Sequence, residues 1–414
     1  MSSITVSNTA ALNSALVSAH SGDTILLNPG TYDGMQAYGL SFAGGITITS
    51  ADLAHQAVLT NFNMDGDHGI TFSNLEFYAQ APGYFVFNIS NSSDIHLDHL
   101  NIHGSLDGNP QNDTQGVAIT GSTNVSVTNS EFQQLRAALG INTTTGITVT
   151  GNHIHDVEAT GMVFGQVANV TISGNLINDF KPAPGDHADA IQFQSRGTTV
   201  ASHDITITDN AIFRGSGDAT QGIFLRDQTT TLPYQNVTIA NNLIDGTGYG
   251  GIYLSSVGKT LVTGNTLVSL TGGTNTTPIV VEDSDHVTLT NNQAISFGYA
   301  TSTNLVQSGN SINAAVTDYG VGALRTWLVA HPDLAATLAA DGLSGVVSPA
   351  PARRCLSPTR RRAARMRQPR WSGTQPRCSP PQTSVSPTRT AITCRRSRST
   401  PCRRSAVSLT MASR

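Results

Sequence analysis

A short motif of alternating apolar and polar residues recurs along the first three quarters of the chain. In a copy such as Asn169-Val170-Thr171-Ile172-Ser173, apolar side chains occupy every second position. Alternation with this period is typical of a β-strand with one buried face. Successive copies lie 22 to 35 residues apart, the repeat length of a β-solenoid with variable loops. The pattern predicts an all-β, right-handed parallel β-helix of about nine to eleven rungs, in which these apolar positions align: Ile70, Ile95, Val125, Ile147, Val170, Ile205, Val237, Leu261 and Val287.

The residues that follow each copy predict the corners of the rungs. Most copies lead into Gly-Asn or a similar pair and then an apolar residue, as in Gly174-Asn175-Leu176. Glycine and asparagine tolerate the left-handed conformation that turns the chain. Asparagines at equivalent corners would lie above one another, where stacked amides bond their equivalents. We therefore expect a structural ladder made of Asn152, Asn175, Asn210, Asn242, Asn265 and Asn292.

Both ends of such a solenoid need a cover, because open strand edges and core would otherwise face solvent. Near the start, an amphipathic helix that begins near Thr9 is predicted by the spacing of Leu12, Ala15, Leu16 and Ala19. Near the other end, a second helix is predicted by Leu324, Trp327 and Leu328, and a third begins at Pro332 and stops at Asp341-Gly342. We place the β-helix and its first helix at residues 1–317 and a C-terminal helical cap at residues 318–350.

The run Gly22-Asp23-Thr24-Ile25-Leu26-Leu27-Asn28-Pro29-Gly30-Thr31-Tyr32, followed by Asn-Val-Thr-Ile-type rungs, resembles the pectate-lyase-like β-helix superfamily. The resemblance covers roughly residues 4 to 317. This superfamily includes secreted alginate lyases and mannuronan C5-epimerases, so the resemblance implies an enzyme that acts on a polyuronate. The epimerases carry Asp-Pro-His-Asp at the catalytic rung, where this chain has Asp186-His187-Ala188-Asp189. No subfamily motif is intact, and the rung motif is specific for the fold rather than the reaction.

The composition changes abruptly after residue 350. Residues 351–414 hold 16 arginines, no aspartate or glutamate, and all four cysteines of the chain. We expect this Arg-, Pro- and Ser-rich tail to be disordered, because it lacks the apolar residues needed to offset the entropy of ordering. The loss of acidic residues, together with a drop to a single glycine, Gly373, suggests a frame-shifted reading of the gene. The alternative is a basic arm that binds nucleic acid or an anionic surface.

Without the tail, 7 basic residues stand against 27 acidic ones, a formal net charge of −20. A body of this charge would be repelled by nucleic acid, so no nucleic-acid partner is expected. The sequence has neither a Sec-type signal peptide nor an apolar run long enough to span a membrane. From the superfamily resemblance we expect a secreted or cell-surface protein of a bacterium. The sequence does not define an oligomeric state.

A second strand recurs within each rung and gathers the polar groups of interest. Its inward positions would stack as Ile191, Ile223, Ile252 and Ile279. One outward ladder would then contain Ala118, Val163, Gln192, Phe224, Tyr253 and Val280, and the other Thr120, Gly165, Gln194, Arg226, Ser255 and Glu282. Because Asp, His, Gln and Arg side chains concentrate on a few adjacent rungs of this face, we identify it as the candidate active site.

Cleaving or inverting a uronate requires a group that neutralises its carboxylate, a base for the C5 proton and an acid. Arg226 is suited to hold the carboxylate, and His187 is the candidate base, oriented by Asp189 or Asp186. Tyr253 is the candidate proton donor. The other substrate-binding candidates are Gln192, Gln194, Arg196, Lys181, Phe224 and Glu282.

Four aspartates near this face could instead collect Ca²⁺, which prefers several carboxylate and carbonyl oxygens. They are Asp186, Asp189, Asp227 and Asp283. A bound Ca²⁺ would take over the neutralising role of Arg226. No organic cofactor is expected.

Three functions remain open from the sequence. The first is a lyase or C5-epimerase acting on an acidic polysaccharide such as alginate or pectate. The second is a glycoside hydrolase, for which Asp186, Asp189 and Asp227 are the available carboxylic acids. The third is a non-catalytic adhesin or carbohydrate-binding surface protein, in which the long face only adheres.

Overall fold

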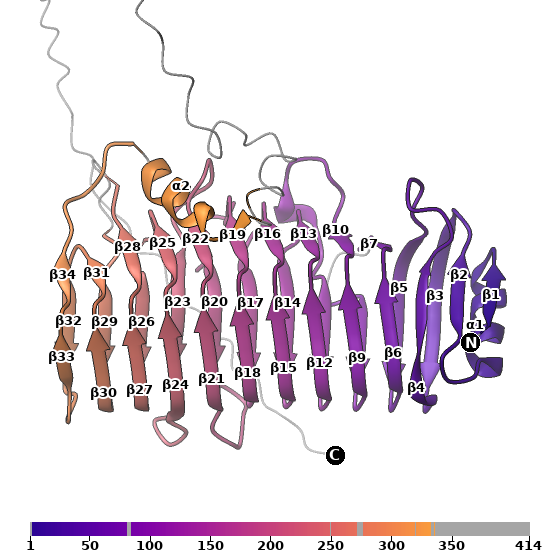
Figure 1. Ribbon diagram of the computed structural model, residues 1–414, viewed down its shortest axis with the longest axis horizontal. Helices are drawn as coiled ribbons and strands as arrows, with labels where there is room; N and C mark the ends of the chain where they lie inside the picture. Colours follow the sequence, from indigo (N-terminus) through magenta and orange to yellow (C-terminus); the bar gives the residue numbers. More distant parts are fainter. Residues whose placement is uncertain are drawn as a thin grey trace, which may run out of the picture. The chain divides into compact units, whose positions relative to one another are not determined.

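The computed structural model describes residues 2–80, 84–248, 250–270, 276–318, 320–332 and 335, and this part of the chain is almost entirely β-structure. Figure 1 shows the strands stacked in register along one axis. All the strand pairs within the sheets are parallel, and consecutive turns of the chain pair directly. The fold is therefore a right-handed parallel β-helix, as predicted.

One face of the helix is a 13-stranded parallel sheet built from the Asn-Val-Thr-Ile copies. Its strands are β1 (Ser3–Val6), β2 (Thr24–Leu27), β4 (Ser41–Ser50), β6 (His68–Ser73), β9 (Ser93–Asp98), β12 (Thr123–Thr128), β15 (Thr145–Thr150), β18 (Ala168–Ser173), β21 (His203–Thr208), β24 (Tyr234–Ala240), β27 (Val257–Thr263), β30 (Asp285–Thr290) and β33 (Val306–Ser308).

The remaining 21 strands form one pairing network, because β5 pairs with both β7 and β8 and so joins two arms. The short-strand arm contains β7 (Glu76–Tyr78), β10 (Asn101–His103), β13 (Glu131–Gln133), β16 (His153–His155), β19 (Leu176–Asn178), β22 (Ala211–Phe213), β25 (Leu243–Asp245), β28 (Thr266–Val268), β31 (Gln293–Ala294) and β34 (Ser311–Ile312). The long-strand arm contains β3 (Thr31–Tyr38), β5 (Val58–Asp65), β8 (Phe87–Ser90), β11 (Val117–Thr120), β14 (Ala137–Asn142), β17 (Thr160–Gly165), β20 (Asp189–Gln194), β23 (Gln221–Arg226), β26 (Ile252–Ser255), β29 (Ile279–Glu282) and β32 (Phe297–Ala300).

Nine turns, from β6–β7–β8 to β30–β31–β32, carry all three strands, which lies within the predicted number of rungs. The apolar residues of alternate positions fill the inside of these turns. Ile147, Val170 and Ile205 are in register and at most 2% exposed. One continuous hydrophobic core thus runs through the stack.

The register differs from the sequence prediction at two places. Thr260, and not Leu261, aligns with Val237 and Val287, and Leu261 points outward with 37% of its surface exposed. Val262 is completely buried, and this determines which positions of β27 point into the core. In addition, the sequence prediction missed β14. One outward ladder therefore lacked Gly140, between Ala118 and Val163, and the other lacked Asn142, between Thr120 and Gly165. The segment Ala137-Ala138-Leu139-Gly140-Ile141 has no polar residue to reveal the alternation.

The asparagine ladder is confirmed. Each amide Nδ2 donates to the Oδ1 of the next asparagine at 2.9 to 3.0 Å, from Asn152 through Asn292. The ladder continues to Asn310, and at its other end Asn152 Oδ1 accepts from the Ser130 backbone N–H at 3.0 Å. These amides satisfy the backbone at one corner of each turn from Asn152 to Asn310, and Ser130 occupies that corner in the turn before Asn152.

Helix α1 (Thr9–Ser18) covers the first turn, as predicted, with Leu12, Ala15 and Leu16 buried. The Asn8 side chain caps it by accepting from Ala11 N–H at 2.9 Å. A 3-10 turn, η1 (Pro110–Asn112), lies in the loop between β10 and β11.

Helix α2 (Val321–Val329) forms where predicted but does not cover the last strands. Leu324 and Leu328 pack on the flank of the short-strand arm, which Figure 1 shows as an orange helix beside β22 and β25. The reason is that several outward positions of this arm are apolar, namely Leu176, Ala211, Phe213, Leu243 and Val268, so the helix buries more surface there. Pro332 and Ala335 are helical, whereas Asp341-Gly342 and the tail 351–414 lie outside the described residues.

Candidate active site on the long-strand arm

The outward face of the long-strand arm has the register that the sequence predicted over β20, β23, β26 and β29. Ile191, Ile223, Ile252 and Ile279 stack inside. Outside, one row runs Gln192, Phe224, Tyr253 and Val280, and the other runs Gln194, Arg226, Ser255 and Glu282.

A histidine–aspartate pair lies at the start of β20. The His187 side chain is 59% exposed, while the Asp189 side chain is fully buried, and His187 Nδ1 lies 3.3 Å from Asp189 Oδ2. The same carboxylate oxygen accepts from Gln192 Nε2 at 2.7 Å. Burial raises the pKa of Asp189 to about 6, against the opposing effect of His187. The structure therefore combines an accessible imidazole with a carboxylate that orients it from inside.

The second nitrogen of His187 is contacted by Gln221, which the sequence analysis did not single out. Gln221 Nε2 lies 2.8 Å from His187 Nε2, and Gln221 pairs with Asp189 across β20 and β23. If His187 Nδ1–H donates to Asp189, Nε2 is the acceptor of the amide N–H and carries the lone pair. In this tautomer the Nε2 lone pair accepts the Gln221 N–H, so Nε2 can act as a base only when that amide turns away.

Two aromatic rings form a platform next to this pair. Phe224 and Tyr253 stack with centroids 5.0 Å apart and planes inclined by 16°. The edge of the platform meets the His187 ring, whose centroid is 6.1 Å from that of Phe224. Tyr253 Oη donates to Glu282 Oε2 at 2.7 Å. Burial and the Glu282 carboxylate raise the pKa of Tyr253 to about 12, so its hydroxyl keeps its proton at neutral pH.

Arg226 is exposed and lies two residues beyond Phe224 on the same face of β23. This spacing corresponds to about 7 Å between Cα atoms. His187 therefore lies against one side of Phe224, and Arg226 follows Phe224 along β23. Gln194 is paired with Arg226 in register, and Arg196 is exposed in the turn after β20.

Lys181 has a partner of its own. Its Nζ lies 2.5 Å from Asp156 Oδ1, in the loop after β16. In the described structure this ammonium therefore neutralises Asp156 and does not contact the His187 pair.

A second pair of carboxyl groups lies beside His187, and the sequence analysis missed one of its members. Glu158 is 5% exposed and shares a hydrogen bond with Asp186, and Arg136 Nε is 3.7 Å from Glu158 Oε2. Burial and Asp186 raise the pKa of Glu158 to about 7. Because Thr160 aligns with Asp189, Glu158 occupies the position of His187 one rung earlier. Alignment of the rungs, rather than a motif, is the signal that would have found it.

The four aspartates proposed as calcium ligands have different surroundings. Asp227 is 4% exposed, and its two oxygens accept from Ser195, Thr229 and Leu232. Asp283 accepts from Thr301, in the turn after β29. Within the described residues, the group of three side chains close enough to share one ion is on the short-strand arm and consists of Glu131, His153 and His155. A calcium requirement stays a prediction.

One comparison, with a family model, agrees with this architecture. Residues 85–267 match the family model described as right handed beta helix region. Among solved structures, a surface adhesin of Streptococcus pneumoniae shares 14% identity, with 73% of this chain and 89% of that chain covered and a TM-score of 0.49. A PL6-family polysaccharide lyase from Pseudopedobacter saltans shares 14% identity, with 75% and 92% covered and a TM-score of 0.47. A periplasmic alginate epimerase shares 15% identity, with 71% and 74% covered and a TM-score of 0.44.

At these identities the likenesses concern the fold alone. No curated protein sequence matches the chain. In the described part of the chain, neither helix has the length and apolar character needed to cross a bilayer.

Proposed function

We propose that the chain binds an acidic polysaccharide along the long-strand arm and acts on it as a lyase or C5-epimerase. The proposal takes as its premise that residues 85–267 match the right handed beta helix region. The observation that carries the proposal is the His187–Asp189 pair at the edge of the Phe224–Tyr253 platform. Stacked aromatic rings on an exposed face present apolar ring edges that a sugar ring can contact. An exposed imidazole backed by a buried carboxylate is suited to remove a proton.

The chemistry follows from the positions of these groups. His187 Nε2 would take the C5 proton of a uronate that lies on the platform, once the Gln221 amide has turned away from that nitrogen. Arg226, which follows Phe224 along β23, would hold the uronate carboxylate and so make the C5 proton more acidic. Tyr253 would donate a proton to the leaving oxygen in a lyase or to the opposite ring face in an epimerase. Gln192, Gln194, Arg196 and Glu282 border this path and would contact neighbouring sugars.

The hydrolase alternative finds less support. A glycosidase needs two carboxyl groups roughly 5 to 9 Å apart across the bond that is cleaved. Glu158 and Asp186 instead share a hydrogen bond, and Asp227 uses its oxygens to hold its own loop. Since the substrates considered are extracellular polymers, the proposal also implies that the protein acts outside the cytoplasm of a bacterium.

The test is an activity screen with alginate, pectate and glycosaminoglycans. New absorbance near 230 nm would identify a lyase, and exchange of the C5 proton with solvent deuterium without chain scission would identify an epimerase. Each reaction is run with added Ca²⁺ and with a chelator, because a loss of activity on chelation would support a calcium site among Asp186, Asp189, Asp227 and Asp283.

The matched variants are His187→Gln and His203→Gln. His203 also forms an exposed histidine–aspartate pair, with Asp204 at 2.7 Å, but on the 13-stranded sheet. We expect His187→Gln to lower kcat at least about 100-fold, the usual contribution of a general base, and His203→Gln to keep wild-type activity. Reducing ends without new absorbance would favour the hydrolase. Binding without any reaction would favour the adhesin, and an unchanged His187→Gln enzyme would exclude the assigned base.

A further inference from the structure

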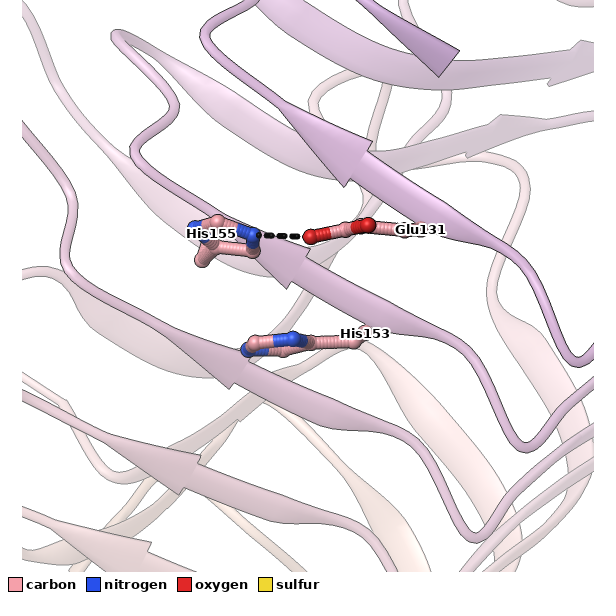
Figure 2. A group of neighbouring side chains, drawn as sticks. All are labelled: Glu131, His153 and His155. Atoms are coloured by element: carbon pink, nitrogen blue, oxygen red, sulfur yellow. Dashed lines mark hydrogen bonds and ion pairs between the residues drawn. The ribbon is translucent and has the colours of Figure 1, made fainter. Parts of the chain in front are cut away.

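A second cluster of titratable side chains lies on the outward face of the short-strand arm and plays no part in the proposed reaction. Glu131 projects from β13, and His153 and His155 project from the neighbouring strand β16. Figure 2 shows the three side chains extending to the same side of these strands. The side chain of His155 is 14% exposed and that of Glu131 is 35% exposed, while His153 is buried, so the cluster is enclosed but reachable through Glu131.

The geometry of the cluster suits one ion. Each of the three residues offers one donor atom, and these atoms all lie within 4.8 Å of one another. His155 Nε2 is 3.0 Å from Glu131 Oε1, and the two imidazole rings stack with centroids 4.2 Å apart. An ion with bonds of about 2.0 to 2.2 Å to nitrogen and oxygen can therefore be reached by all three after small side-chain rotations.

The surroundings of both imidazoles are those of metal ligands. His155 Nδ1 is 2.7 Å from Asp156 Oδ2, and that carboxylate is fixed in turn by Lys181. His153 Nε2 is 2.9 Å from Asn178 Oδ1. A hydrogen bond from the second ring nitrogen to a carboxylate or carbonyl oxygen fixes the tautomer of a histidine ligand and increases its basicity. Both rings have such a partner.

We propose that Glu131, His153 and His155 form a binding site for a divalent cation of the Zn²⁺ or Co²⁺ class. Two imidazoles and one carboxylate favour such cations, whereas Ca²⁺ prefers ligand sets made of oxygen alone. The site joins two successive rungs. Through Asp156 and Lys181 it also reaches the loop that leads to His187.

A neighbouring pair supplies a matched control. His103 Nε2 is 3.0 Å from Glu76 Oε1 on β10 and β7 of the same arm, which reproduces the contact between His155 and Glu131. His103 stacks on Tyr78 where His155 stacks on a second imidazole. A cation that needs two imidazoles should therefore distinguish the two places.

The experiment uses the full chain without an affinity tag, because polyhistidine binds the same cations. The four cysteines of the tail are first alkylated with iodoacetamide, since free thiolates would also bind Zn²⁺. In the absence of an ion, burial lowers the pKa of His155, but the hydrogen bonds that its ring donates to Asp156 and Glu131 outweigh this effect and raise the pKa to about 9. Titrations with ZnCl₂ by calorimetry and with CoCl₂ by visible absorption are run at pH 7.5, where both cations stay in solution, and binding of the ion should release the His155 proton.

We expect one equivalent of Zn²⁺ to bind and to raise Tm, with Co²⁺ giving the visible spectrum of a site without thiolate. His155→Ala and the nearly isosteric Glu131→Gln should each weaken binding about tenfold or more, whereas His103→Ala should bind as the wild type does. Far-UV circular dichroism checks that each variant is folded. The proposal is overturned if the folded wild type binds no Zn²⁺, if Ca²⁺ displaces Co²⁺, or if His103→Ala loses as much affinity as His155→Ala. None of these outcomes depends on polysaccharide activity.

Discussion

The carboxyl group of Asp189 is completely enclosed, yet one of its oxygens, Oδ1, has no hydrogen-bond partner among the described residues. Leaving a buried polar atom unsatisfied costs about 1 to 3 kcal/mol. Its other oxygen meets both His187 and Gln192. This unfavourable free energy has a reason if the carboxylate orients the His187 ring and stabilises its positive charge after it takes a proton. A histidine that acts as a general base requires both.

This arrangement predicts a pH dependence for the proposed reaction. Because the pKa of Asp189 is raised to about 6, its carboxyl group is protonated below that pH and can no longer stabilise a protonated His187. The rate should therefore fall as pH decreases through about 6. Asp189→Asn should lower kcat and change the shape of this acidic limb, because asparagine does not titrate.

At the level of single residues, the sequence revealed those members of the site that are neighbours in the chain. Asp186, His187 and Asp189 were found because they form one short polar run. Glu158 and Gln221 were missed because each belongs to a different rung, and only the register places them beside His187. Side-chain pairing, such as that of Lys181 with Asp156, depends on loop conformation and has no counterpart in the pattern.

At the level of elements, the sequence predicted the strands well because nearly every copy of the motif alternates apolar and polar residues and ends in corner residues. The two errors, at β14 and β27, arose where that alternation is weak or shifted by one residue. The asparagine corners were easier to predict than the strands, since a polar side chain inside an apolar stack needs a repeated partner. Asn175, Asn210 and Asn242 are at most 1% exposed.

The ladder leads to a prediction on stability. Asn210 Oδ1 accepts from both the N–H and the Nδ2 of Asn175, and its own Nδ2 donates to Ile172 O and Asn242 Oδ1. Asn210→Ala would leave these buried groups unpaired, at about 1 to 3 kcal/mol each. We expect a loss of roughly 3 kcal/mol or more in the free energy of unfolding, measured by urea denaturation.

The control for this variant is Asn28→Ala, because the Asn28 amide donates a single exposed hydrogen bond, to Ser7. It should cost less than about 1 kcal/mol. Equal losses in the two variants would show that the ladder contributes no more than surface amides do.

At the level of the whole molecule, buried carboxyl groups with raised pKa values make the free energy of unfolding depend on pH. Some of these groups belong to the candidate active site. Asp245 is 3% exposed and lies at the N-terminus of α2, where a Cβ on Gly320 would collide with its carboxylate. Burial and the nearby Asp318 raise the pKa of Asp245 to about 7. Glu158 and Asp189, with pKa values of about 7 and about 6, behave in the same way.

These groups set the direction of the pH dependence of stability. Between about pH 4 and 7 the folded state binds more protons than the unfolded state, whose carboxyl groups have pKa values near 4. Stability therefore decreases as pH rises through this window. Below it, carboxylates with lowered pKa values, such as Asp23 and Asp285 at about 2, act in the opposite direction, because their contribution is lost as pH falls. We expect Tm to be highest near about pH 4 to 5 and to decline toward pH 8.

Asp245→Asn tests this explanation, since asparagine resembles the protonated acid at every pH. At pH 8 it removes a buried charge, so Tm should rise by a few degrees, whereas at pH 4.5 it should change little. Asp218→Asn, at an exposed carboxylate in the loop before β23, should leave the whole Tm profile unchanged. Calorimetric melts of the three proteins between pH 4 and pH 8 measure the difference. If Asp245→Asn were as destabilising at pH 8 as at pH 4.5, the ionised carboxylate would be stabilising α2 through contacts at its N-terminus, and the decline of Tm with pH would need another cause.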